Sequence, residues 1–249
     1  RFVLGFLVMI GALVFLGCPL RMILRLANGD LNALVGVLGF VFGIMVGIQF
    51  IKGGFTLGRS YKQAPVNGYI MPLLALTLLV LAFLKPSFIN FSESGPGATH
   101  APLVFSLAVG LIIGAIVQRT RLCTVGGFRD ALLIKDFHLF KGLLSIFIFA
   151  LLGNLLFNPA SFKIGFVGQP IAHNDILWNF LGMTLAGLGS VLLGGCPLRQ
   201  TILSAEGDTD AAVTGFGRMA GAAFAHNFGL ADSPQGVPGS GQVAVVIGL

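Results

Sequence analysis

Long apolar stretches, separated by short polar connections, follow one another from one end of the chain to the other. An apolar stretch of about 20 residues is long enough to span the hydrocarbon core of a bilayer as a helix. We therefore expect spans near 1–17, 31–51, 69–85, 102–118, 141–157, 176–195 and 210–230, and an eighth that begins near 242. Turn-forming residues such as those at 85–87, 94–97 and 158–159 mark the connections. The pattern predicts an all-α, polytopic membrane protein with a single membrane domain over 1–249.

Composition supports this interpretation. Hydrophobic residues make up 55% of the chain and charged residues 10%, whereas soluble domains carry roughly 25% charged residues. The mean hydropathy is +0.93 and the isoelectric point is about 9.7. The net charge of +6 does not indicate nucleic-acid binding, because the basic residues lie between apolar segments, where they set membrane orientation. We therefore expect the lipid bilayer, and no nucleic acid, as a partner.

Two connections are rich in basic residues and should lie in the cytoplasm by the positive-inside rule. One carries Lys52, Arg59 and Lys62, and the other carries Arg119, Arg121, Arg129, Lys135 and Lys141. Two expected spans separate these connections, so both fall on the same face, as the rule requires. The connections at 86–101 and 158–175 then lie outside.

A five-residue motif occurs twice. Gly17-Cys18-Pro19-Leu20-Arg21 returns as Gly195-Cys196-Pro197-Leu198-Arg199, 178 residues later (196 − 18), and the match continues in register. Five expected spans lie between the copies, so the copies should cross the membrane in opposite directions, as in the inverted repeats of many transporters. We expect the second half of a first copy at about 1–68 and a second copy at about 69–246. We also expect truncation at both ends.

The Cys-Pro step in each copy interrupts an apolar run. Proline removes a backbone N–H and clashes with the preceding turn, so a broken or re-entrant helix is expected at Cys18 and at Cys196. A thiol is soft and weakly hydrogen-bonding, which suits a sulfur species better than a hard oxyanion. The alternative is a helix end at which a small cysteine merely packs.

Cys123 has a different setting, because Arg119 and Arg121 precede it closely. If near in space, they would favour the thiolate and attract an anion to the cytoplasmic mouth. The alternative is that they only set topology. Arg218 lies within an expected span, where a charge usually faces a cavity, and it is a further candidate anion contact.

The remaining polar residues indicate no enzyme. Asp30 and Asp208 each follow a glycine and precede an apolar span, so we interpret them as helix N-caps. Three widely spaced cysteines do not make a metal site, and the chain has no nucleophile elbow or phosphate-binding loop. We expect neither cofactor nor metal.

At these residues the sequence resembles the YeeE/YedE family of bacterial inner-membrane proteins, with the closer likeness to its YedE-like, selenium-associated branch. The matching segments are Cys18-Pro19-Leu20-Arg21 with Asn28-Gly29-Asp30, Arg121-Leu122-Cys123 through Gly127 with Arg129-Asp130, Gln169-Pro170-Ile171-Ala172-His173, and Cys196-Pro197-Leu198-Arg199 with Glu206-Gly207-Asp208. The resemblance implies a pseudo-symmetric helical protein with short helices dipping toward its centre. It also implies uptake of thiosulfate or a related species, handed along by weak S–H···S contacts between Cys18, Cys123 and Cys196.

Two functions are compatible with the sequence. The first is import of a small sulfur- or selenium-containing anion along a path lined by the three thiols and by the basic residues Arg21, Arg199, Arg119, Arg121 and Arg218. The second is a membrane redox or sulfur-transfer protein whose cysteines form persulfides and pass them to a small cytoplasmic sulfur-carrier protein.

Overall fold

The computed structural model describes residues 1–58, 63–90, 98 and 100–249. Arg59, Lys62 and the expected turn at 94–97 lie outside the described residues. The described part contains helices and no named strand. The helices are α1 (Phe2–Val14), α2 (Pro19–Ala27), α3 (Leu31–Lys52), α4 (Pro65–Gly68), α5 (Ile70–Leu84), α6 (Leu103–Thr120), α7 (Thr124–Leu133), α8 (His138–Phe157), α9 (Ile176–Leu192), α10 (Pro197–Ala205), α11 (Thr209–Asn227) and α12 (Gly239–Gly248).

These helices confirm the all-α, polytopic prediction. Six helical segments in the described residues are long and apolar enough to cross a membrane: Phe2–Ala27, Leu31–Lys52, Pro65–Leu84, Leu103–Leu133, His138–Phe157 and Ile176–Ala205. The protein is therefore a multi-pass membrane protein. The helix α11, which the sequence predicts as a span, is regular over 19 residues but is not one of the six. Its small and polar residues make it less hydropathic than the other long helices.

Two groups of three helices form the centre. We call α1, α2 and α3 unit A, and α9, α10 and α11 unit B. In each unit a long helix ends, a short helix follows after a break, and a second long helix completes the unit. The helix α3 packs along α9, and α1 packs along α11. The two largest helix–helix contacts in the fold therefore each join a helix of unit A to a helix of unit B.

Glycines four residues apart, at 39, 43 and 47 in α3 and at 217 and 221 in α11, bring these helices close together, as such spacing predicts. A Cβ atom added at Gly39 of α3 would lie 2.2 Å from the carbonyl oxygen of Phe180, and one added at Gly217 of α11 would lie 2.1 Å from that of Phe2. Both members of the first pair map onto the second by the 178-residue offset. The two interfaces therefore use equivalent positions.

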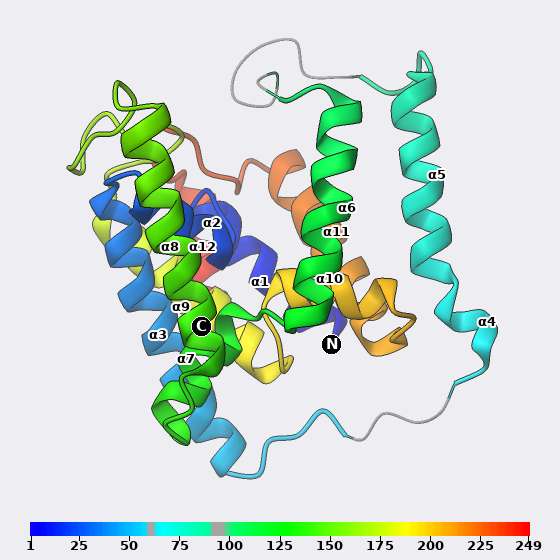
Figure 1. Ribbon diagram of the computed structural model, residues 1–249. Helices are drawn as coiled ribbons and strands as arrows, with labels where there is room; N and C mark the ends of the chain where they lie inside the picture. The colour runs from blue at the N-terminus through cyan, green and yellow to red at the C-terminus, as the bar shows by residue number, and fades with distance from the viewer. Residues whose placement is uncertain (59–62, 91–97, 99) are drawn as a thin grey trace.

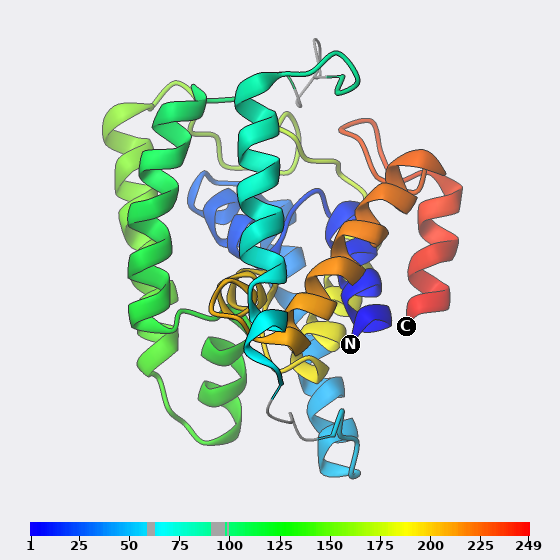
Figure 2. The same cartoon turned by 90° about the vertical axis from the view of Figure 1, so that its right-hand side faces the viewer.

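The other helices surround this centre unevenly. The helix α8 packs against α2 and α7, whereas α5 has no buried residue and α6 has one, Val117. Figure 1 shows α5 at the edge of the molecule, and Figure 2 shows it in front of the short helices. Most of the surface of α5 and α6 is therefore available to lipid or to further protein.

Candidate functional site

The three cysteines occupy the same local position. Cys18, Cys123 and Cys196 are the N-cap residues of the short helices α2, α7 and α10, each with an extended backbone. Proline follows as the first helical residue in α2 and α10, where its missing N–H is harmless. The breaks predicted at both Cys-Pro steps are thus confirmed. Because a helix N-terminus presents free N–H groups and a positive dipole end, each cysteine lies where an anion is favoured.

The chain leaves the first long helix of each unit in the same way. Leu16 in unit A and Gly194 in unit B have left-handed backbones, with φ of 61° and 78°. The N–H groups of Gly17 and Gly195 donate back to carbonyls five residues earlier, over 2.8 and 3.0 Å. The turn between the first long helix and the cysteine is therefore set by backbone geometry and not by a particular side chain.

Each break frees a carbonyl that a side chain of the following helix satisfies. Nη1 of Arg25 donates to the Phe15 carbonyl over 2.7 Å in unit A, and Nε2 of Gln200 donates to the Leu193 carbonyl over 3.0 Å in unit B. In a membrane an unsatisfied carbonyl costs several kcal/mol, so such partners are needed at a broken helix. Arg25 also forms a buried ion pair with Asp30 at 2.7 Å.

Cys123 and Cys196 meet at the facing N-termini of α7 and α10. The N–H of Cys196 donates to Sγ of Cys123, and the N–H of Thr124 donates to Sγ of Cys196, each over 3.4 Å. The exposed fractions of Cys123 and Cys196 are 6% and 1%. The sequence does not predict this contact, because 72 residues lie between the two cysteines. The basic residues before Cys123 instead indicate a position at the cytoplasmic mouth.

Arg218 of α11 contacts the first two turns of α10, within unit B. It donates to the Pro197 carbonyl over 2.6 Å and to Oγ1 of Thr201 over 3.1 Å. Its guanidinium is within electrostatic reach of Cys196 and Cys18. No ion pair joins it to a carboxylate in the part of the chain that the structure describes. The sequence predicts a charge facing a cavity here, and the structure places that charge against the start of α10.

Arg21 and Cys18 lie at a more open place. Cys18 is only partly buried, and the Arg21 side chain packs over Gly17. Arg21 also lines a pocket of about 540 Å³ between α2, α8 and the segment before α9. The polar residues of this pocket are Arg21, Arg25, Asn28, Asp30, Asn154 and Gln169. By the topology argued from sequence, this pocket opens to the outside.

The three remaining candidate arginines, Arg199, Arg119 and Arg121, differ in their burial. The Arg199 side chain packs over Gly195 in the first turn of α10, and its Nη1 is buried without a partner in the described residues. Arg119 and Arg121 are exposed at the end of α6, where Arg121 has a left-handed backbone. They precede the buried thiol pair in sequence, and their side chains remain at the surface.

Sequence reasoning missed two buried polar contacts beside the breaks. One is the Arg25–Asp30 pair, and the other joins His173 to Asp232. Nε2 of His173 also lies 2.9 Å from the carbonyl of Val14, the last residue of α1. His173 belongs to a motif noted in the sequence, but nothing there indicated its partner. The expected N-caps are confirmed, since Asp30 and Asp208 accept from the N–H groups of Asn32 and Ala211.

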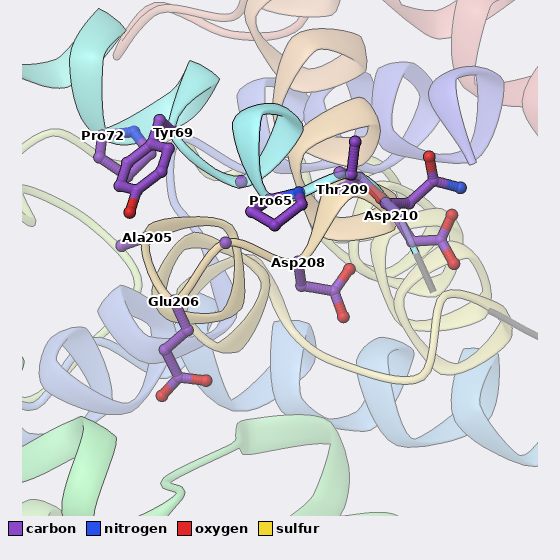
Figure 3. Close-up of a pocket in the computed structure, with 12 residues that line it drawn as sticks. Pro65, Tyr69, Pro72, Ala205, Glu206, Asp208, Thr209 and Asp210 are labelled. Atoms are coloured by element: carbon purple, nitrogen blue, oxygen red, sulfur yellow. The ribbon is translucent and has the colours of Figure 1, made fainter. Parts of the chain in front are cut away.

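A larger cavity lies away from the cysteines. It has a volume of about 720 Å³ between α4–α5 and the connection from α10 to α11. Figure 3 shows Glu206, Asp208 and Asp210 along it, with Tyr69 opposite. Because this lining is acidic, it is unsuited to an anion, and the thiol-lined centre remains the candidate site.

Comparison with known proteins gives two kinds of match. A family model described as sulphur transport matches residues 119–245. The thiosulfate transporter TsuA of Spirochaeta thermophila is 39% identical over 105 residues, which is 42% of this chain and 31% of that protein. The thiosulfate transporter TsuA of Escherichia coli is 31% identical over 113 residues, which is 42% of this chain and 29% of that protein. The match thus spans less than a third of either relative. No solved structure matches the chain.

Proposed function

This chain belongs to the sulphur transport (YeeE/YedE) family, and from that premise we propose that it imports a small sulfur-containing anion such as thiosulfate across a bacterial inner membrane. Both relatives are named thiosulfate transporters. Neither name mentions selenium, so the selenium-associated branch stays a prediction.

The observation that carries this proposal is the shared position of the three cysteines. Each thiol stands at the positive end of a short helix inside a broken apolar run. Half-helices whose N-termini point at an anionic group build the binding sites of several transporter folds. A thiol at that point adds a soft, weak hydrogen-bond donor, which suits the terminal sulfur of thiosulfate.

The path we propose runs from the pocket beside Arg21 to Cys18, then to Cys196 and Cys123, and leaves past Arg119 and Arg121. Arg218 and Arg199 supply positive charge near the thiol of Cys196, in unit B. The ion passes by exchange of weak S–H···S contacts, so no strong bond has to break at any step. The chain itself carries out no chemical conversion in this mechanism.

We also propose that units A and B are related by an inverted repeat. The equivalent glycine contacts at Gly39 and Gly217, the matched left-handed turns and the matched N-caps support it. A twofold relation makes residue i contact j while the equivalent of j contacts the equivalent of i, and the α3–α9 and α1–α11 interfaces have that form. An axis in the membrane plane follows from the odd number of spans between the copies.

Uptake into proteoliposomes tests the proposal. Labelled thiosulfate, selenite, sulfite and sulfate are compared, and thiosulfate should enter fastest. Cys18→Ala and Cys196→Ala should each abolish uptake, whereas the matched control Ser145→Ala, whose hydroxyl bonds only within its own helix, should not. Unchanged thiosulfate uptake in the Cys18→Ala/Cys196→Ala double variant would reject the relay.

The alternative function keeps the same residues but makes covalent bonds. A thiolate of Cys123 would attack the outer sulfur of thiosulfate, forming a cysteine persulfide and releasing sulfite. A small cytoplasmic sulfur-carrier protein would then take the persulfide sulfur. The N–H groups of Gly126 and Cys196 donate to Sγ of Cys123, and hydrogen bonds of this kind favour the charged form of the sulfur. Mass spectrometry of the protein after exposure to thiosulfate separates the two, because only the alternative gives a stoichiometric adduct that forms as fast as turnover.

A further inference from the structure

Cys123 and Cys196 are in reciprocal contact through their sulfur atoms. Each sulfur accepts from a backbone N–H at the start of the other cysteine's helix, over 3.4 Å in both directions. Such a reciprocal arrangement brings the two Cβ–Sγ bonds face to face. Disulfides need only Cα atoms within about 4.4–6.8 Å and side chains that point toward each other. The reciprocal contact through both sulfurs therefore makes this pair a candidate for a disulfide.

The two thiols also differ in ways that suit stepwise oxidation. Cys123 is 6% exposed and Cys196 is 1% exposed, whereas Cys18 lies in the other unit at the more open position. A second N–H, from Gly126, also reaches Sγ of Cys123 over 3.3 Å. Thiolates held by helix N-termini react with peroxides, and a neighbouring thiol then resolves the product.

We propose that Cys123 and Cys196 form a reversible disulfide that closes the path, which makes the pair a redox-sensitive modification site as well as part of the proposed route. The oxidant is a peroxide. One of the two thiols loses its proton, its sulfur attacks one peroxide oxygen and the O–O bond breaks, which leaves a sulfenic acid and a hydroxide that takes up the released proton as water. The other thiol then attacks the sulfenic sulfur, an S–S bond forms, and a second water leaves. In total, two thiols and one hydrogen peroxide give one disulfide and two waters.

The disulfide would stop passage for a structural reason. It removes both S–H donors at the narrow contact between α7 and α10. It also ties the two helix N-termini together, so their N–H groups can no longer turn to an ion. A thiol reductant restores both, because thiolate exchange opens the bond. This inference rests on the proposed transport function only for its effect on uptake, since the disulfide can be measured without any transport assay.

The test uses the full chain in proteoliposomes treated with hydrogen peroxide and then with an alkylating agent. We expect the free thiols to fall from three to one, with Cys18 remaining and the peptides of Cys123 and Cys196 linked. Residual thiosulfate uptake should equal the fraction of protein that is not linked, and dithiothreitol should restore it. In the Cys18→Ala variant the same link should form, whereas Cys123→Ser and Cys196→Ser should each keep both remaining thiols free.

Three results would overturn the proposal. One is a link from Cys18 in place of the Cys123–Cys196 link, another is a thiol count that peroxide leaves at three, and the third is a complete Cys123–Cys196 link with full uptake. Peptide mapping of the unmutated chain keeps the test valid even if a variant fails to fold. Absence of uptake before any oxidation would contradict the proposed transport function instead, and the thiol count would still decide whether the disulfide forms.

Discussion

Units A and B have the same order of long and short helices but bury their positive charges at different places. Arg25, in the last turn of α2, occupies a position that is Leu203 in unit B. Arg218, in the middle of α11, occupies a position that is Phe40 in unit A. Each unit thus has one buried arginine where the other has a large apolar residue.

The surroundings of the two arginines show what each does. Arg25 pairs with Asp30 and satisfies the Phe15 carbonyl, so its charge is neutralised within the fold. Arg218 binds the Pro197 carbonyl and the Thr201 hydroxyl, both uncharged, and lies near two thiols. The difference teaches that Arg25 holds a broken helix together, whereas the charge of Arg218 has only uncharged hydrogen-bond partners in the described residues, which is why we propose that it meets the transported anion.

The largest expected effect is the loss of thermal stability when Arg25 is replaced. Arg25→Leu gives unit A the residue that unit B has, and it leaves Asp30 buried without its partner. Removing one member of a buried ion pair typically costs about 3–5 kcal/mol, so the purified protein should melt at a clearly lower temperature. The double variant Arg25→Leu/Asp30→Asn should recover part of the loss, because no buried charge then remains. A wild-type melting temperature for Arg25→Leu would contradict the structural role.

The next largest effect is the loss of thiosulfate uptake when Arg218 of unit B is replaced. Arg218→Gln keeps a donor for the Pro197 carbonyl but removes the charge. A hydrogen bond to a charged group contributes about 1.5–3 kcal/mol, so thiosulfate uptake at low substrate should fall by roughly tenfold to a hundredfold. Arg218→Lys should restore much of it, and thermal stability should change far less than uptake. Equal uptake by the Gln and Lys variants would show that Arg218 acts through packing alone.

A smaller effect sharpens the equivalence of the two interfaces. Gly39→Ala and Gly217→Ala each place a methyl group against a carbonyl oxygen of the partner helix. Overpacking of this kind costs about 1–3 kcal/mol, and the two losses should be similar if the interfaces are equivalent. Gly110→Ala in α6, where a Cβ meets nothing within 4 Å, is the matched control. Thermal melting of the three variants decides, and a loss at one interface only would break the symmetry.

The smallest effect concerns the outer pocket. Arg21→Gln removes a charge that only attracts the ion, and partly exposed charges contribute about 0.2–1 kcal/mol. The substrate concentration at half-maximal uptake should therefore rise about twofold to fivefold, with the maximal rate unchanged. The effect should shrink at high salt, because exposed charges are screened. A fall in the maximal rate instead would place Arg21 inside the rate-limiting step.

The sequence predicts the local features of this fold well. Apolar periodicity places the helices, the Cys-Pro steps place the breaks, and Asp30 and Asp208 cap the helices that follow. All of these depend on neighbours within a few residues. Glycine spacing also predicts close packing, although it does not say which helix is the partner.

What the sequence does not predict depends on distant partners. The contact of Cys123 with Cys196 and that of His173 with Asp232 join residues far apart in the chain. No periodicity encodes such pairs, because they arise from how the helices pack. For the same reason, the sequence names Arg218 as a charge near a cavity but not as a neighbour of both Cys-Pro breaks. The relay, the inverted repeat and the limits of its copies stay predictions.

The N–H groups that open α7 already have acceptors. Those of Thr124 and Gly126 donate to the sulfurs of Cys196 and Cys123, so an arriving ion has to compete with the protein for the same donors. An ion that gains little binding free energy at each site leaves that site quickly. Rapid flow through a pore requires sites that release the ion as readily as they bind it. We therefore expect the ion to stay only briefly at each site, and we expect no saturation at low concentrations. The protein should conduct its ion quickly and with low affinity, at a rate that follows the outside concentration of the ion.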